Sequence, residues 1–289
     1  MNDFIITTDT TSDLPQDYID KHKLNTLPLY YQFDETVYGG GNELDSKDFF
    51  DRMRKGSMPT TMAANPEAAR EMFTSIIDKG LDIIHIALSS AISGSYSVAA
   101  TVAREICEER PDAKISVIDS LGASLGEGLL VHKALQLKEE GKSFDEVVNW
   151  VEDNKLNLCH MFTVDDLNHL YRGGRVSKAT AVIGTLIKVK PILHMDNDGR
   201  LVPLYNVRSR KKALTALVDN MEERIRNYQG ENNEVFISHG DSIEDAEFVA
   251  SLVRERFDID NILINYVSPT IGAHSGPGTL ALFFMGSER

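Results

Sequence analysis

The sequence predicts an α/β protein built from two α/β domains. Short apolar runs rich in strand-forming residues alternate with helical patterns along the whole chain of 289 residues. The apolar share of 42% and the charged share of 26% are those of an ordinary globular protein. This length is sufficient for two domains that each bury a core of their own.

The expected strands form two series. They cover residues 4–8, 27–31, 83–88 and 115–118 in the first series, and 160–164, 201–205, 235–239, 262–266 and 279–284 in the second. Helix starts are also marked in the sequence. Asn65 followed by Pro66 fits an N-cap and a first helical position, and Ser143 with Glu146 has the capping-box pattern of a helix that we expect to end near Lys155. Further helices are expected at 211–227 and 243–257.

The polar stretch 152–157 separates the two series and contains no run that could form a core. We therefore expect an N-terminal α/β domain at 1–157 and a C-terminal α/β domain at 158–289. Ligands of α/β proteins bind at the carboxyl ends of strands and between domains. The ligand site is accordingly expected between the two domains, in the loops that follow strands.

The formal net charge of -14 argues against a nucleic-acid partner, because nucleic acids attract basic surfaces. One zone of the chain is nevertheless basic: residues 167–195 hold five basic residues and no acid. These residues and the basic ones that follow are Arg172, Arg175, Lys178, Lys188, Lys190, Arg208, Arg210, Lys211 and Lys212. The zone is either a solvated face of basic side chains or a site for an anion or an acidic partner.

Other classes of protein are excluded by simple patterns. No stretch reaches the roughly eighteen uncharged residues that a membrane helix requires, so no integral membrane segment is expected. The first residues lack the basic and apolar regions of a secretory signal, which predicts a cytoplasmic location. The only cysteines, Cys107 and Cys159, form no metal-binding pattern, so neither a disulfide framework nor a zinc site is expected.

The first candidate site is Ser93-Gly94-Ser95, which follows an apolar strand and opens a helix that should run to about Arg110. A helix N-terminus has unpaired backbone N–H groups and partial positive charge, so it favours a carboxylate or a phosphate. Ser93 could equally serve only as a helix cap, and the two roles are compatible. Thr61, in a loop before the capped helix at Asn65, could place a second hydroxyl beside Ser93.

The second candidate is His274, within the glycine-dense run 271–278. We expect this run to be a turn between strands, in which the permissive backbone aims the histidine at a ligand rather than burying it in the core. Arg175, which follows Gly173 and Gly174, and Arg208 lie in the basic zone. Their guanidinium groups suit a carboxylate or a phosphate.

These segments, in this order, resemble the DegV family of bacterial proteins over nearly the whole chain. The matching segments are 8–14, Thr61, 93–96, 117–120, 166–167, 173–175, 190–193, Arg208 and 272–278. The family resembles the fatty-acid-binding subunit of bacterial fatty acid kinase, which presents a bound acid to a separate subunit that uses ATP to make an acyl phosphate. The resemblance implies a carrier without catalytic residues, metal or cofactor, whose ligand is a long-chain fatty acid.

Carried over by position, the resemblance implies that Thr61 and Ser93 hydrogen-bond the carboxylate, with His274 in the same network. Gly94 and Ser95 belong to the same segment, while Arg175 and Arg208 match family arginines associated with the phosphorylation step or with docking to the kinase subunit. Two departures stand out. The family often has Thr-Ser-Gln-Pro-Ser where this chain has apolar residues at 62–64, and glycines at 39–41 replace a usual aspartate.

Two other functions can be assembled from the sequence. The run 122–126 matches the G-x-S-x-G pattern of serine hydrolases, and Ser124, Asp241 and His274 occur in the order of a hydrolase triad. A sugar-phosphate or nucleotide enzyme could use the glycines at 39–41 and the basic zone to hold phosphate, although no P-loop pattern supports it.

Overall fold

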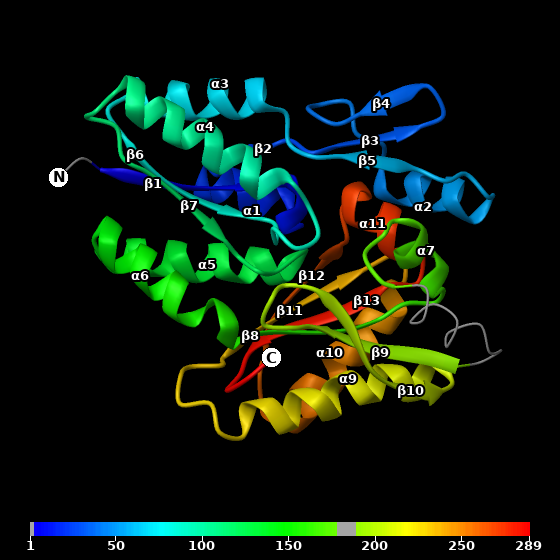
Figure 1. Cartoon of the computed structure of the whole chain (residues 1–289). Coiled ribbons are helices and arrows are strands. Elements are labelled where there is room, and N and C mark those ends of the chain that lie inside the picture. Colours follow the sequence, from blue (N-terminus) through cyan, green and yellow to red (C-terminus); the bar gives the residue numbers. More distant parts are fainter. Residues whose placement is uncertain (1–2, 178–188) are drawn as a thin grey trace.

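The computed structural model describes residues 3–177 and 189–289 and confirms the α/β class (Figure 1). The strands are β1 (Phe4–Asp9), β2 (Asn25–Leu27), β3 (Tyr30–Phe33), β4 (Thr36–Tyr38), β5 (Thr60–Met62), β6 (Asp82–Ala87), β7 (Ile115–Asp119), β8 (Leu158–Thr163), β9 (Val189–Met195), β10 (Leu201–Arg208), β11 (Glu234–His239), β12 (Asn261–Tyr266) and β13 (Leu280–Met285). The α-helices are α1 (Gln16–His22), α2 (Ser46–Arg54), α3 (Pro66–Ile77), α4 (Ser95–Glu109), α5 (Leu125–Glu139), α6 (Phe144–Asn154), α7 (Leu167–Arg172), α9 (Arg210–Ile225), α10 (Ile243–Phe257) and α11 (Pro269–Ser275). Two short 3-10 turns are η1 (Thr10–Ser12) and η2 (Lys155–Asn157).

The N-terminal half forms a parallel sheet with strand order β2-β1-β6-β7. Helices α3 and α4 cover one face of this sheet, and α5 and α6 lie against the other (Figure 1). Neighbouring residues of β6 therefore enter different cores: Ile83 packs with α3 and α4, whereas Ile84 packs with α5. Because both faces are covered, every residue of β6 is buried.

The C-terminal half forms a six-stranded sheet with order β10-β9-β8-β13-β11-β12, antiparallel except for the β11–β12 pair. Side chains alternate along β13. Leu280, Leu282 and Phe284 pack on the face covered by α9 and α10, whereas Ala281 and Phe283 turn toward α5. This alternation gives the sheet two buried faces.

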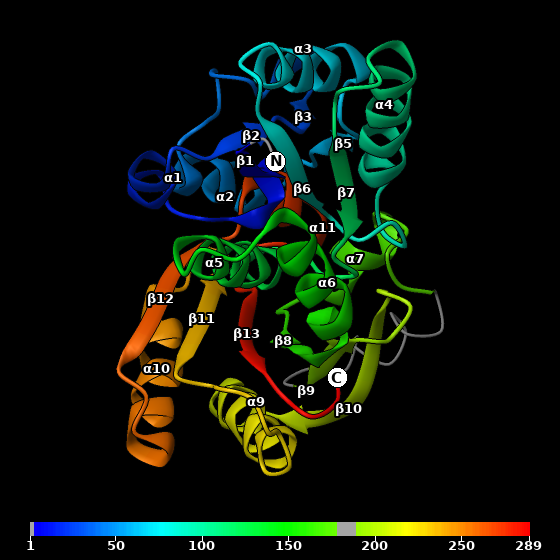
Figure 2. The same ribbon diagram turned by 90° about the vertical axis from the view of Figure 1, so that its left-hand side faces the viewer.

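Helix α5 lies between the two sheets, as both views show (Figures 1 and 2). Nine of its fifteen residues are buried, because both of its faces pack against protein. Two of its glycines permit this close packing. A Cβ atom on Gly126 would lie 2.2 Å from His160 Nε2 in β8, and one on Gly128 would lie 2.6 Å from the carbonyl oxygen of Ser12 in η1. The helix thus holds the two halves together.

The chain changes from one sheet to the other at β8, next to the predicted boundary between 157 and 158. The division into separate domains at this boundary remains a prediction, because residues of α5 and of both sheets pack together in one hydrophobic core. Within residues 3–177 and 189–289, no helix is long and apolar enough to cross a membrane.

Two local predictions were wrong. The predicted strand 27–31 is divided, because the chain leaves β2 at Pro28, which has no N–H group to continue the ladder, and enters β3 in a separate small sheet with order β4-β3-β5. The glycine-dense run around His274 is not simply a turn but contains helix α11, which begins with Pro269 as its first helical residue and ends at Ser275, just before Gly276, where φ is +80°. The capping box of Ser143 and Glu146 is confirmed at the start of α6.

Candidate functional site

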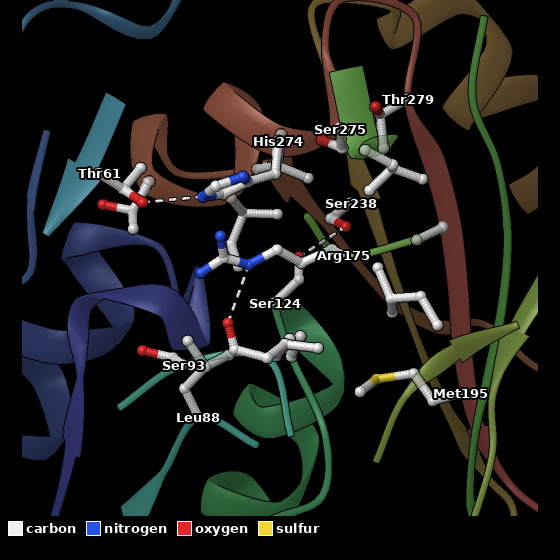
Figure 3. Close-up of a pocket in the computed structure, with 18 of the residues that line it drawn as sticks. Thr61, Leu88, Ser93, Ser124, Arg175, Met195, Ser238, His274, Ser275 and Thr279 are labelled. Atoms are coloured by element: carbon white, nitrogen blue, oxygen red, sulfur yellow. Dashed lines mark hydrogen bonds between the residues drawn. The ribbon is translucent and has the colours of Figure 1, made fainter. Parts of the chain in front are cut away.

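A cavity lies between the two halves of the protein, and we call it the central cavity. Three segments that are distant in the sequence contribute hydroxyl or imidazole groups to its wall: Thr61 in β5, Ser93 before α4 and His274 in α11. Figure 3 shows these side chains on one side of the pocket, with Met195 on the opposite side. We call the first side the polar end of the central cavity.

Thr61 and His274 form the core of the polar end. Thr61 Oγ1 lies 2.8 Å from His274 Nε2, within hydrogen-bonding distance. Burial, together with the nearby guanidinium groups of Arg175 and Arg172, lowers the pKa of His274 to about 4. The imidazole is therefore neutral near pH 7, and it carries one N–H donor and one acceptor nitrogen.

The position of the His274 ring depends on a glycine at the end of α7. A Cβ atom on Gly173 would lie only 2.1 Å from His274 Nδ1, so no other residue fits there without moving the ring. Gly272 allows similarly close packing within α11, because a Cβ atom added at this position would lie 2.8 Å from Phe50 Cζ. The glycines around His274 thus allow close packing of α11 on both sides.

Ser93 lies one residue before the N-cap of α4, which is Gly94. Its Oγ accepts a hydrogen bond from the Ser95 N–H at 3.2 Å, and the residue also lines the central cavity together with Gly94. Ser95 is placed differently from the prediction. It is buried, it is absent from the cavity wall, and its Oγ accepts a hydrogen bond from the Ala64 N–H at 3.1 Å. Ser95 therefore ties the two loops that carry Ser93 and Thr61.

The structure separates the two predicted arginines. Arg175 is half-buried in the cavity wall, where its Nε donates to the Ile92 carbonyl at 2.9 Å and its guanidinium also donates to the Gly173 carbonyl. Burial lowers the pKa of Arg175. Arg208 is exposed at the end of β10 and is not part of the wall of the central cavity. Lys178 and Lys188 of the basic zone lie outside the described residues.

The wall away from the polar end is mainly apolar. Phe162 of β8 faces Ala281 of β13, and Phe283 continues the same face of the sheet two residues further along. Each residue advances a strand by about 3.3 Å, so these side chains extend the apolar wall along the sheet. Leu170 and Met195 complete this part of the wall. The arrangement suits a ligand with a polar head and an apolar body.

The hydrolase triad is not assembled. The Ser124 hydroxyl donates to Asp13, and its oxygen lies 2.9 Å from Ser238 Oγ. Asp241 pairs with Arg54, and His274 pairs with Thr61. Each member of the expected triad thus contacts a residue outside the triad, and the serine hydrolase hypothesis has no support.

The glycines at 39–41 do not form a phosphate-binding loop. All three have positive φ, as a tight turn requires. The Gly39 N–H donates to Asn42 Oδ1, and the Gly41 N–H donates to the carboxylate of Glu43. These donors are occupied, and a phosphate would meet the negative charge of Glu43. Within the described residues, no cluster of three or more His, Cys, Asp or Glu side chains is placed to hold a metal ion.

Fold and cavity together define a class: α/β proteins in which a cavity, polar at one end and mainly apolar elsewhere, lies between two sheets joined by a central helix. The family model described as "Uncharacterised protein, DegV family" matches residues 3–287. This chain belongs to the DegV family. It is 42% identical over 291 residues to a DegV domain-containing protein of Clostridium perfringens, with 100% of this chain and 99% of the relative covered.

Solved structures agree with this assignment. DegV of Bacillus subtilis, described as a fatty acid binding protein, is 30% identical, with a TM-score of 0.83 over 99% of this chain and 100% of the other. A DegV family protein from Thermus thermophilus, whose structure is described by its fatty acid binding, is 26% identical, with a TM-score of 0.87 over 99% of this chain and 100% of the other.

Proposed function

We propose that this protein is a cytoplasmic carrier that binds one long-chain fatty acid in the central cavity, with the carboxylate at the polar end. The observation that carries the proposal is the meeting of Thr61, Ser93 and His274 at one side of a cavity whose remaining wall is mainly apolar. Solved relatives of the same fold are described as fatty acid binding proteins, which supports the same ligand class here.

The two ends of the ligand contribute differently to binding. Each buried methylene of the tail contributes about 0.8 kcal/mol, so an apolar wall binds long chains tightly whatever the head group. A buried carboxylate is costly unless it is hydrogen-bonded. The hydroxyls of Thr61 and Ser93 and the neutral ring of His274 supply donors without a fixed positive charge. The carboxylate can therefore remain ionised and keep its nucleophilic oxygens.

An ionised, weakly paired carboxylate is suited to attack the γ-phosphate of ATP. We propose that a separate kinase subunit supplies the ATP site: a carboxylate oxygen bonds to the γ-phosphorus, the bond from that phosphorus to the bridging oxygen breaks, and the γ-phosphoryl group passes to the acid while ADP leaves. Arg175 lies in the cavity wall, where its guanidinium can approach the transferred phosphate, and exposed Arg208 can contact the kinase subunit or the phosphate.

The head-group assignment is tested by the double variant Thr61→Val with Ser93→Ala. Loss of both hydroxyls should weaken binding of palmitic acid to delipidated protein by about ten- to a hundredfold, because each lost hydrogen bond to a charged group is worth about 1.5–3 kcal/mol and water compensates in part. Thr60→Val is the matched control, because Thr60 is an exposed neighbour in the same strand and is absent from the cavity wall. Equal affinity of the double variant and the wild type would reject the assignment.

The kinase step is tested separately with Arg208→Ala. The variant should bind palmitic acid as the wild type does, because Arg208 is not part of the central cavity wall, yet it should form acyl phosphate more slowly with a bacterial fatty acid kinase ATP subunit. Arg104→Ala on α4 removes another exposed arginine and serves as the control. Unchanged acyl phosphate formation by the Arg208 variant would remove that residue from the proposal.

A further inference from the structure

The wall of the central cavity contains polar groups that a plain hydrocarbon tail cannot satisfy. Ser275 is the last residue of α11, is only 6% exposed and lines the cavity. Its hydroxyl has no hydrogen-bond partner in the part of the chain that the structure describes. Thr279, also in the wall, differs in this respect, because its Oγ1 donates to the Gly276 carbonyl at 2.7 Å.

A second hydroxyl with free capacity lies in the same wall. Ser238 in β11 is fully buried, and its Oγ lies 2.9 Å from Ser124 Oγ. Ser124 has one hydroxyl hydrogen, which it can donate either to the carboxyl group of Asp13 or to Ser238. Whichever of the two serines supplies the hydrogen between them, the Ser238 oxygen keeps at least one lone pair for a further donor.

Asp13 holds the other end of this chain of hydrogen bonds. Its other carboxylate oxygen, Oδ1, accepts a hydrogen bond from the Ser268 N–H at 3.0 Å. Asp13 thus contacts Ser124 through one carboxyl oxygen and Ser268 through the other. Ser238 therefore sits at the cavity end of the chain with acceptor capacity left, while Ser275 keeps both a donor hydrogen and acceptor lone pairs.

Both hydroxyls lie beyond the polar end. Figure 3 shows Ser275 and Ser238 on the far side of His274 from Thr61, toward the strands β11 and β13. Both belong to the wall of the cavity that a chain anchored at the polar end would occupy. A purely hydrocarbon chain would bury the Ser275 hydroxyl without a partner, which is unfavourable, whereas a hydroxyl on the chain could accept from Ser275 and donate to Ser238.

We propose that the preferred ligand of the central cavity is a long-chain fatty acid that carries a hydroxyl group on its chain, bound by Ser275 and Ser238. This inference rests on the proposed function and specifies its substrate class. The carboxylate keeps its place at Thr61, Ser93 and His274. Ser275 and Ser238 then determine specificity, because they distinguish a hydroxylated chain from the parent acid.

The experiment compares stearic acid with a series of hydroxystearic acids, each with its hydroxyl at a different chain position, by displacement of a fluorescent fatty acid from delipidated protein. In the wild type, the best hydroxystearic acid should bind about fivefold to tenfold more tightly than stearic acid, and tenfold corresponds to about 1.4 kcal/mol. The ratio of the two affinities should fall to about one or below in Ser275→Ala.

Thr279→Val is the matched control, because it removes a hydroxyl whose partner is already a protein carbonyl, and the ratio should stay at the wild-type value. If the wild-type protein binds stearic acid, and none of the hydroxystearic acids binds more tightly than stearic acid does, the inference is overturned while the proposed function stands. A preference that survives in Ser275→Ala also overturns it. If neither acid binds, the proposed function itself fails.

Discussion

The substitution Gly173→Ala tests how the polar end is built. The new methyl carbon would lie 2.1 Å from His274 Nδ1, and ordinary contact begins at 3.4 Å, so ring and methyl must separate by about 1.3 Å (3.4 minus 2.1). A shift of this size is enough to break the 2.8 Å contact between His274 and Thr61. Gly173 has φ of -70°, which alanine adopts freely, so the effect is steric and not a matter of backbone strain.

The expected loss follows from the broken hydrogen bond. Leaving a buried donor or acceptor unpaired costs about 1–3 kcal/mol, so the affinity for palmitic acid should fall by about one to two powers of ten. Isothermal titration calorimetry of delipidated protein measures this change. Gly174→Ala is the control, because its Cβ atom meets nothing within 4 Å. It should lower stability by about 1–2 kcal/mol, since φ is +75° there, while affinity stays unchanged.

A double-mutant cycle identifies the cause. In a His274→Ala background the methyl group of residue 173 meets no imidazole, so Gly173→Ala should cost almost nothing further. The reasoning is refuted if Gly173→Ala binds palmitic acid like the wild type, or if its loss of affinity is equally large in the absence of the imidazole.

Three further predictions concern pH and packing. Burial raises the pKa of Asp13 from 3.8 to about 7. At 1.36 kcal/mol per pH unit, this shift corresponds to about 4 kcal/mol of stability. That stability is present below about pH 4 and is lost as the pH rises through about 7. Asp13→Asn should therefore flatten the fall in unfolding free energy between about pH 5 and about pH 8, measured by urea denaturation, and equal slopes would contradict this. The His274 ring, with its pKa near 4, should show no titration in NMR spectra between about pH 6 and about pH 8, whereas a midpoint near 6.5 would disprove its burial. Gly126→Ala should destabilise the protein by about 1–3 kcal/mol or more, because the alanine methyl group would lie 2.2 Å from His160 Nε2. A melting temperature within a degree or so of the wild-type value would refute the close packing of α5.

Much of the fold could be predicted because local patterns match the burial that the structure shows. Strands β6, β8, β11 and β13 are buried along their whole length, and their apolar runs are visible in the sequence. Helix starts at Asn65 and Ser143 depend on neighbouring residues alone, so their caps could be predicted. The small sheet and the break at Pro28 depend on partners distant in the sequence, which local patterns do not encode.

The site was predictable in part. Chemistry and family resemblance selected Thr61, Ser93 and His274, and the structure brings all three to one cavity. Ser95 and Arg208 were chosen by the same reasoning but lie outside the cavity wall, because sequence proximity does not determine which way a side chain points. The contact of Ser124 with Asp13 spans 111 residues of sequence and has no local signal. The G-x-S-x-G pattern drew attention to Ser124 but suggested the wrong chemistry.

The central claim is that the cavity between the two sheets holds a fatty acid. Native mass spectrometry of the freshly purified protein, followed by identification of the released lipid, tests it most directly. We predict one long-chain fatty acid per chain, with rebinding of one equivalent of palmitic, oleic or hydroxystearic acid after delipidation. A protein that carries no lipid and that, once delipidated, binds none of these acids at micromolar concentration would contradict the account.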